Sequence, residues 1–145
     1  ESLNTSQILV GLDLGTKTLG VAVSDRYKII ASPLSTIQRN GTKKDLLKLQ
    51  EILNDYEIGG FIVGLPLSLD NSENQQTQLV RNFNKELIDF FSLPSVFWDE
   101  RFSSDIIFKE MRRSNMSKNK IKNKLDQQSA SYILQGYLER YRKNK

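Results

Sequence analysis

The stretch "ILVGLDLGTKTLGVAVSD", residues 8–25, constrains the fold of this chain more than any other part of its sequence. Two apolar runs, 8–14 and 19–25, flank a short Gly-Thr-Lys turn, which predicts a β-hairpin with buried strands. Asp13 stands inside the first run. A buried carboxylate without a partner is costly, so Asp13 must be paired, bound to a metal or placed at the solvated end of the strand. A salt bridge to Lys17 or a capping role in the turn is the structural alternative.

Further along, the chain alternates between strand-like and helix-like patterns. Residues 30–37 favour a third strand, and Pro33 confines it to a sheet edge or a bulge. A helix is expected from Thr42, a plausible N-cap with Asp45 three residues later. The other expected elements are a buried parallel strand at 59–67, a helix with an apolar stripe from Leu79 to Phe91, a strand at 95–102, and helices at about 104–113 and 125–142.

This order of elements, β-β-β-α-β-α-β-α-α, predicts an α/β fold with a mixed sheet covered by helices. At 145 residues, 38% of them hydrophobic and 26% charged, the chain suits one globular domain over 1–145. The segment 114–124, "SNMSKNKIKNK", is expected to be a flexible basic linker before the last helix.

Two residue types are missing, and their absence excludes several chemistries. The sequence contains no histidine and no cysteine, which excludes His-based triads, imidazole bases, disulfides and thiolate metal sites. Its first residues show no secretory signal pattern, and no apolar run is long enough to span a bilayer. We therefore expect a cytoplasmic protein without a membrane partner.

Charge is distributed unevenly along the chain. From Lys109 onward there are eleven basic and three acidic residues, whereas residues 1–108 hold ten basic and fourteen acidic ones. This asymmetry predicts that the C-terminal third meets a polyanionic partner such as nucleic acid. A solvated helix face is the alternative.

Acidic residues at two further places stand out beside Asp13. Asp99 and Glu100 follow the apolar end of a predicted strand, where ligands gather in α/β sheets, and strand alternation allows only one of them to face a given site. Asp126 precedes Ala130 by four residues and so lies on the core-facing stripe of the last helix, although a first-turn acid can also serve the helix dipole. Oxygen ligands of this kind suit Mg²⁺ (or Mn²⁺), and two such ions can hydrolyse a phosphodiester.

Four stretches of the chain resemble the signature stretches of the YqgF/RuvX family: "GLDLGTKTLGVAVSD", "IVGLPLSLD", "DERFSS" and "LDQQSASYILQGYL". These are small bacterial proteins described as Holliday junction resolvases or as nucleases for pre-16S ribosomal RNA. The resemblance implies a ribonuclease H-like three-layer fold, with a mixed five-stranded sheet flanked by helices. It also implies catalytic, metal-binding acids at Asp13, at the acidic pair (Glu100 is favoured) and at Asp126.

The last of these stretches departs from the family pattern. Where the family usually reads D-S-A-S-A, Gln127 and Gln128 here intervene before Ser129. The aspartate and its helical phase are kept, so we expect the departure to affect local packing more than the site.

The resulting hypothesis is a metal-dependent endonuclease acting on structured RNA or branched DNA. Lys17 and Arg101 are expected to neutralise the phosphate, and the basic segment to track the backbone through Lys118, Lys120, Lys122 and Lys124. Processing of the 5′ end of pre-16S rRNA is favoured over junction resolution. Resolution needs two symmetric cuts and normally a dimer, whereas nothing in the sequence demands more than a monomer or weak homodimer. A protein that binds nucleic acid without cutting it is a further alternative.

Overall fold

The computed structural model describes residues 6–67, 70, 72–99 and 118–143, and the side chains of its last helix over 128–142. One five-stranded sheet lies at its centre, in the order β3-β2-β1-β4-β5. The strands are β1 (Ile8–Leu14), β2 (Thr18–Ser24), β3 (Ala31–Gln38), β4 (Ile58–Leu65) and β5 (Ser95–Asp99). β2 pairs antiparallel with both β1 and β3, whereas β4 pairs parallel with both β1 and β5. The mixed sheet expected from the sequence is therefore confirmed.

The predicted hairpin and the predicted place of Pro33 are both confirmed. The hairpin turn closes with a hydrogen bond of 2.8 Å from the Gly15 N–H to the Thr18 carbonyl. β3 is an edge strand, and the β2–β3 register shifts between Val21 and Ala22, where Ala22 faces Pro33. A proline has no N–H to donate to a ladder, so an edge strand with an irregularity accommodates it.

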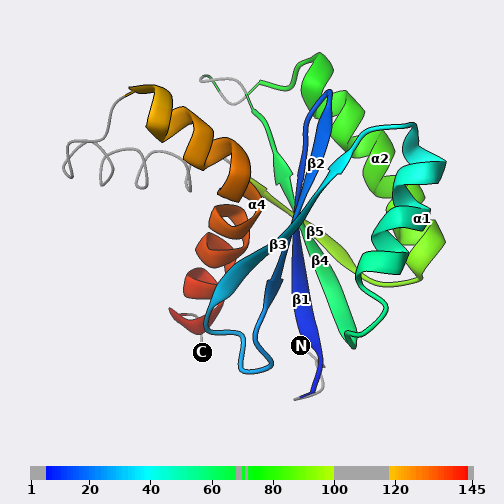
Figure 1. Ribbon diagram of the computed structural model, residues 1–145, viewed down its shortest axis with the longest axis vertical. Coiled ribbons are helices and arrows are strands. Elements are labelled where there is room, and N and C mark those ends of the chain that lie inside the picture. Colours follow the sequence, from blue (N-terminus) through cyan, green and yellow to red (C-terminus); the bar gives the residue numbers. More distant parts are fainter. Residues whose placement is uncertain (1–5, 68–69, 71, 100–117, 144–145) are drawn as a thin grey trace.

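Helices cover both faces of the sheet and make a three-layer architecture. α1 (Thr42–Ile52) and α2 (Gln75–Phe91) pack on one face, and α4 (Lys118–Lys143) packs on the other (Figure 1). Each face has its own apolar cluster. Val10, Leu12 and Leu14 of β1 pack toward α1 and α2, whereas Leu9 packs toward Ile133, Leu134 and Leu138 of α4.

The start of α1 differs from the prediction. Gly41 is the N-cap and Thr42 is the first helical residue, so the expected N-cap at Thr42 was wrong. The cap position has φ 101°, a backbone conformation that glycine adopts and threonine avoids. Asp45 does not reach back to an N-cap N–H as a capping box would. Its carboxylate instead accepts the N–H of Asn40 at 2.9 Å.

α2 also corrects the expected core stripe. Val80, Phe83 and Leu87 are buried as expected, but the side chains of Leu79 and Phe90 are 52% and 36% exposed. The buried face follows the phase of Val80, Phe83 and Leu87, which leaves Leu79 about 100° around the helix from Val80.

The last helix begins earlier than predicted. α4 starts at Lys118 rather than near 125, so residues 118–124 of the expected linker are helical. Lysine is a good helix former, which suits these positions to a helix despite their repeated positive charge. The flexibility of the linker stays a prediction, and the helix expected at 104–113 lies outside the described residues. No helix in the described part of the chain has the length and hydropathy needed to cross a membrane.

Candidate active site

Asp13 lies near the carboxyl end of β1, on the face of the sheet that α4 covers. Strand residues alternate between faces, so Asp13 shares its face with Leu9 and Gly11, while Leu12 and Leu14 pack on the opposite face. Asp13 is half-buried, whereas Leu12 and Leu14 on either side of it are buried. The carboxylate is therefore at the solvated end of its strand, one of the three resolutions expected from the sequence.

Two glycines allow α4 to approach this part of the sheet closely. A Cβ on Gly11 would lie 2.7 Å from the Cβ of Leu134 and 2.8 Å from the carbonyl oxygen of Ala130. Gly20, which faces Asp13 across the β1–β2 pair, has Ala130 Cβ at 3.4 Å from the same hypothetical atom. Backbone and helix thus come together at a distance that no larger residue at Gly11 permits.

This close approach brings Ser129 to Asp13. The Ser129 hydroxyl donates a hydrogen bond to Oδ2 of Asp13, across 116 positions of sequence. Among the side chains that the structure describes, Asp13 forms no ion pair, with Lys17 or with any other cation. The alternative of an Asp13–Lys17 salt bridge is therefore wrong in this structure, and the described partner of Asp13 is the neutral hydroxyl of Ser129.

The direction of α4 indicates where position 126 lies. Leu134 packs over Gly11, and Ala130 packs over Gly20, the partner of Asp13, so α4 runs antiparallel to β1. Position 126 is one turn before Ala130, and the helix backbone therefore carries it toward the carboxyl end of β1. The side chain of Asp126 lies outside the described ones.

β5 ends at Asp99, the first residue of the second acidic pair. Phe97 packs with the cluster under α1 and α2, and Trp98 packs with the α4 cluster. By strand alternation Asp99 follows Phe97, so it lies on the face opposite Asp13. Glu100, the favoured acid, lies outside the described residues, as does Arg101.

The remaining predicted binding residues are only partly described. Lys17 is exposed in the turn between β1 and β2, and its carbonyl accepts the N–H of Arg39 at 2.9 Å. The four lysines expected to track a nucleic-acid backbone lie within α4, but their side chains are not described: Lys118, Lys120, Lys122 and Lys124. Among the described side chains, no three acidic residues lie close enough together to hold a metal ion. Of the three proposed acids, only Asp13 has a described side chain.

Sequence reasoning did not assign a role to Ser129, although a signal for it existed. Ser129 follows Asp126 by three positions, which places both on one face of a helix. Its neighbour Gln128, part of the departure from the family pattern, is held within α4. Gln128 accepts bonds from the hydroxyls of Ser131 (2.7 Å, at its carbonyl) and Tyr132 (2.9 Å, at its side chain). Burial raises the pKa of Tyr132, so its hydroxyl stays a neutral donor.

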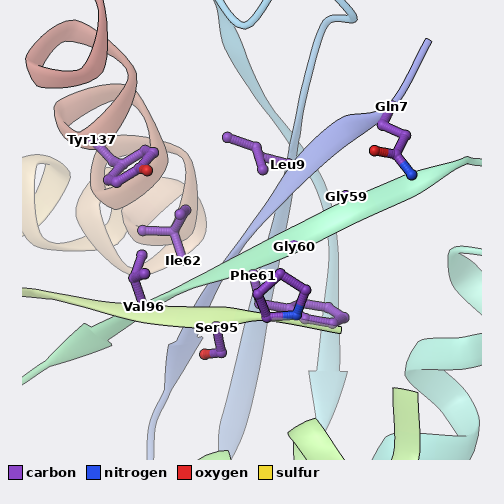
Figure 2. Close-up of a pocket in the computed structure, with 10 residues that line it drawn as sticks. Gln7, Leu9, Gly59, Gly60, Phe61, Ile62, Ser95, Val96 and Tyr137 are labelled. Carbon is purple, nitrogen blue, oxygen red and sulfur yellow. The ribbon is translucent and has the colours of Figure 1, made fainter. Parts of the chain in front are cut away.

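Two cavities lie at opposite ends of the central strands. The first, of about 510 Å³, lies at the amino ends of β1, β4 and β5, and Figure 2 shows Leu9, Ile62 and Val96 there with Tyr137 of α4. It is remote from Asp13 along β1. The second, of about 470 Å³, is lined by Leu14 and Gly15, which directly follow Asp13. The Asp13 carboxylate, on the α4 face at this end of the sheet, marks the candidate active site, and this second cavity lies on the opposite face, which α1 and α2 cover.

Comparisons with known proteins identify relatives by sequence and by fold. A curated protein of Methylocella silvestris named "Putative pre-16S rRNA nuclease" is 42% identical over 137 residues, covering 94% of this chain and 85% of that protein. A protein of Rhodobacter capsulatus with the same name is 42% identical over 132 residues, covering 91% and 83%.

Among solved structures, RuvC of T. thermophilus in complex with a Holliday junction matches 96% of this chain and 97% of that one. Its TM-score is 0.63 at 10% identity. This likeness confirms the expected ribonuclease H-like fold. Residues 7–140 match the sequence family described as "RuvX: Holliday junction resolvase". The chain therefore belongs to the RuvX family.

Proposed function

We propose that this protein is a metal-dependent endonuclease that hydrolyses phosphodiester bonds of structured RNA, in the maturation of the 5′ end of 16S ribosomal RNA. The family description and the names of the relatives agree on a nuclease. The observation that carries the proposal is the half-buried Asp13 carboxylate, held by the Ser129 hydroxyl without a cationic partner among the described side chains. A protein with this function would act in the cytoplasm.

The donor set at this end of the sheet fits a hard divalent cation. A half-buried carboxylate whose charge is not neutralised by an ion pair favours a cation, and carboxylate oxygens are ligands that Mg²⁺ and Mn²⁺ accept. We assign Asp13, Glu100 and Asp126 as its ligands. When bound, the ion would activate water for attack on phosphorus and stabilise the leaving oxygen.

The chain's own groups have distinct roles in this proposal. Ser129 occupies Oδ2 of Asp13 and so fixes the orientation of the carboxylate. Lys17 stands exposed in the turn that follows Asp13, and together with Arg101 it would neutralise substrate phosphate. The lysines of the first two turns of α4 would contact the backbone further along.

A Holliday junction is the second candidate substrate, because the family description names it. Junction resolution needs two coordinated cuts, and thus two active sites in one complex. Processing of ribosomal RNA needs only one. The names of the relatives favour RNA.

The test is to incubate the protein with precursor 16S rRNA and with a four-way DNA junction, each with Mg²⁺ or with a chelator. We expect Mg²⁺-dependent shortening of the RNA precursor. Cleavage of the junction alone would reassign the substrate, and no cleavage of either would contradict the nuclease proposal.

Binding can be separated from chemistry by removing the basic residues of α4. Changing Lys118, Lys120, Lys122 and Lys124 to alanine should weaken binding and lower the slope of log K against log salt by about 0.7 to 0.9 per lost phosphate contact. Cleavage at saturating substrate should persist. A matched control removes the same charge from the other side of the sheet, at the exposed residues Lys43, Lys44, Lys48 and Lys85. An equal loss of binding in the control would contradict the assignment to α4.

A further inference from the structure

The cavity at the carboxyl end of β1, on the face that α1 and α2 cover, has walls from three separate parts of the chain. The β1–β2 turn contributes Gly15, the loop between β3 and α1 contributes Arg39 and Asn40, and one face of α2 contributes Gln76, Leu79 and Asn82. Its volume of about 470 Å³ falls within the ~300–1,000 Å³ typical of sites for small ligands. Gly15 and Asp13 are two positions apart on an extended chain, or about 6–7 Å. The cavity is therefore at the same end of β1 as the Asp13 carboxylate but on the opposite face of the sheet, and its lining residue Thr16 directly precedes the exposed Lys17.

Arg39 forms a rigid part of this wall. Its Nε donates to Oδ2 of Asp45 at 2.6 Å, its Nη1 donates to the Gly15 carbonyl at 3.0 Å, and its guanidinium lies 5.8 Å from the ring centre of Phe83. These contacts leave Nη2 without a hydrogen-bond partner among the described residues. Arg39 therefore presents a fixed donor edge and a planar surface rather than a mobile charge.

The charges around the cavity favour a neutral ligand over a phosphate. The positive charge of Arg39 is compensated by Asp45, which is only 1% exposed, and Glu86 adds a negative charge to the lining. A phosphate site needs uncompensated positive charge, and the described residues that line this cavity offer none.

The uncharged lining combines amides with apolar surface. Gln76 donates to the Leu14 carbonyl at 3.3 Å, which leaves its side-chain oxygen available, and Asn82 accepts from Gln78 at 3.0 Å, which leaves its amide NH₂ available. Leu79 is 52% exposed at the same place, beside the ring of Phe83. Amide donors and acceptors can form hydrogen bonds with the edge of an unstacked base, and apolar or planar surfaces can contact its face.

We propose that this cavity binds one unpaired base of the RNA substrate, from the strand that passes Lys17 in the β1–β2 turn. Arg39 and Phe83 form its planar wall, Leu79 contacts the face of the base, and Gln76 and Asn82 bond its edge. The inference rests on the proposed function and adds a specificity element to it: the enzyme would require an unpaired nucleotide where the substrate passes this end of the sheet. A fully stacked duplex could not supply such a base.

The test measures binding without metal, so that it does not depend on cleavage. A labelled single-stranded RNA and an abasic strand of the same length are titrated with the wild-type protein and with a Leu79→Ala, Asn82→Ala double variant. Both side chains are exposed, so the variant should fold. Wild-type protein should bind the strand with bases about tenfold more tightly, the size expected for one base contact. The double variant should lose most of this preference and bind the abasic strand as well as wild type does.

Gln75→Ala is the matched control, since it removes an exposed amide from the same helix outside the cavity and should keep the preference. A fully paired RNA duplex should bind wild type and double variant equally. An equal loss on both single strands would mean that the cavity contacts phosphate, and no base preference in wild type would also overturn the inference. If cleavage of precursor RNA is intact in that case, only the cavity assignment fails. Absence of cleavage with a cavity-dependent base preference would overturn only the nuclease proposal.

Discussion

Asp13 and Asp45 lie near the same end of the sheet, yet their surroundings are opposite. Asp45 is buried and fully engaged, since its two oxygens accept from the Arg39 guanidinium at 2.6 Å and from the Asn40 N–H at 2.9 Å. Asp13 is half-buried, and among the described side chains it accepts only from a neutral hydroxyl, that of Ser129. A carboxylate neutralised by a buried cation holds a loop in place, whereas one held by a neutral donor keeps its charge available for a ligand. The comparison thus separates a structural acid from a reactive one.

The largest expected effect is the loss of activity in Asp13→Asn. The change removes the charge while keeping the shape, so cleavage should fall by about a thousandfold, or ~4 kcal/mol in the transition state. Folding stability should stay close to wild type, and nucleic-acid binding should persist or tighten because carboxylate–phosphate repulsion falls. Single-turnover cleavage at saturating substrate, with binding measured alongside, checks this. Normal cleavage at matched Mg²⁺ would make Asp13 a structural residue like Asp45.

Asp45→Ala should have the reverse profile. Removing one partner of a buried ion pair leaves the Arg39 charge unsatisfied and should destabilise the fold by about 3 kcal/mol, near the lower end of the range because Arg39 is 20% exposed. Urea denaturation measures the loss, and cleavage per folded molecule should change far less than in Asp13→Asn. Glu51→Ala is the control, since its pair with Lys48 at 3.2 Å is exposed and should contribute less than about 1 kcal/mol. An equal loss of stability in Asp45→Ala and Glu51→Ala would contradict a structural role of the Asp45–Arg39 pair.

Gly11→Ala should reduce both folding stability and cleavage. Its new Cβ would lie 2.7 Å from Leu134 Cβ and 2.8 Å from a backbone oxygen of α4, so the helix must move, at a cost of about 2 kcal/mol. Because α4 also carries Ser129, we expect cleavage to fall beyond the loss of folded protein. Gly20→Ala is the milder comparison, with its nearest contact at 3.4 Å. Thermal denaturation and specific activity of both variants check this, and an unchanged Gly11→Ala protein would contradict the close packing of α4.

Ser129→Ala should give the smallest of these effects and the most specific one. Loss of the hydroxyl should weaken Mn²⁺ binding by about tenfold, as is typical when a group supporting a metal ligand is removed. Calorimetric titration of the metal measures this without substrate, and Ser129→Thr, which keeps a hydroxyl, should restore binding. Ser131→Ala serves as control, because its hydroxyl bonds to the Gln128 carbonyl instead. Equal affinity in Ser129→Ala and Ser131→Ala would show that Ser129 does not orient Asp13.

The candidate site was predictable to different degrees. Asp13 was visible as a charge in an apolar strand. The packing of Phe97 and Trp98, read with strand alternation, assigns Asp99 to the face of the sheet opposite Asp13. Glu100 and Asp126 stay predictions, since their side chains are not described. The bond from Ser129 could not be predicted as a contact, because its partner lies 116 positions away.

Patterns within single segments were enough to predict the hairpin of β1 and β2, the edge position of Pro33, the buried strand β4 and the apolar stripe of α4, because each depends on periodicity or turn chemistry among near neighbours. The close packing of α4 against Gly11, by contrast, depends on tertiary contacts between distant segments. The tertiary structure also decided that Leu79 faces a cavity instead of the core, and that Asp45 pairs with Arg39 rather than capping α1. These outcomes depend on which distant surfaces come into contact. The packing of the helices against the sheet determines those contacts, and the pattern within a single segment does not.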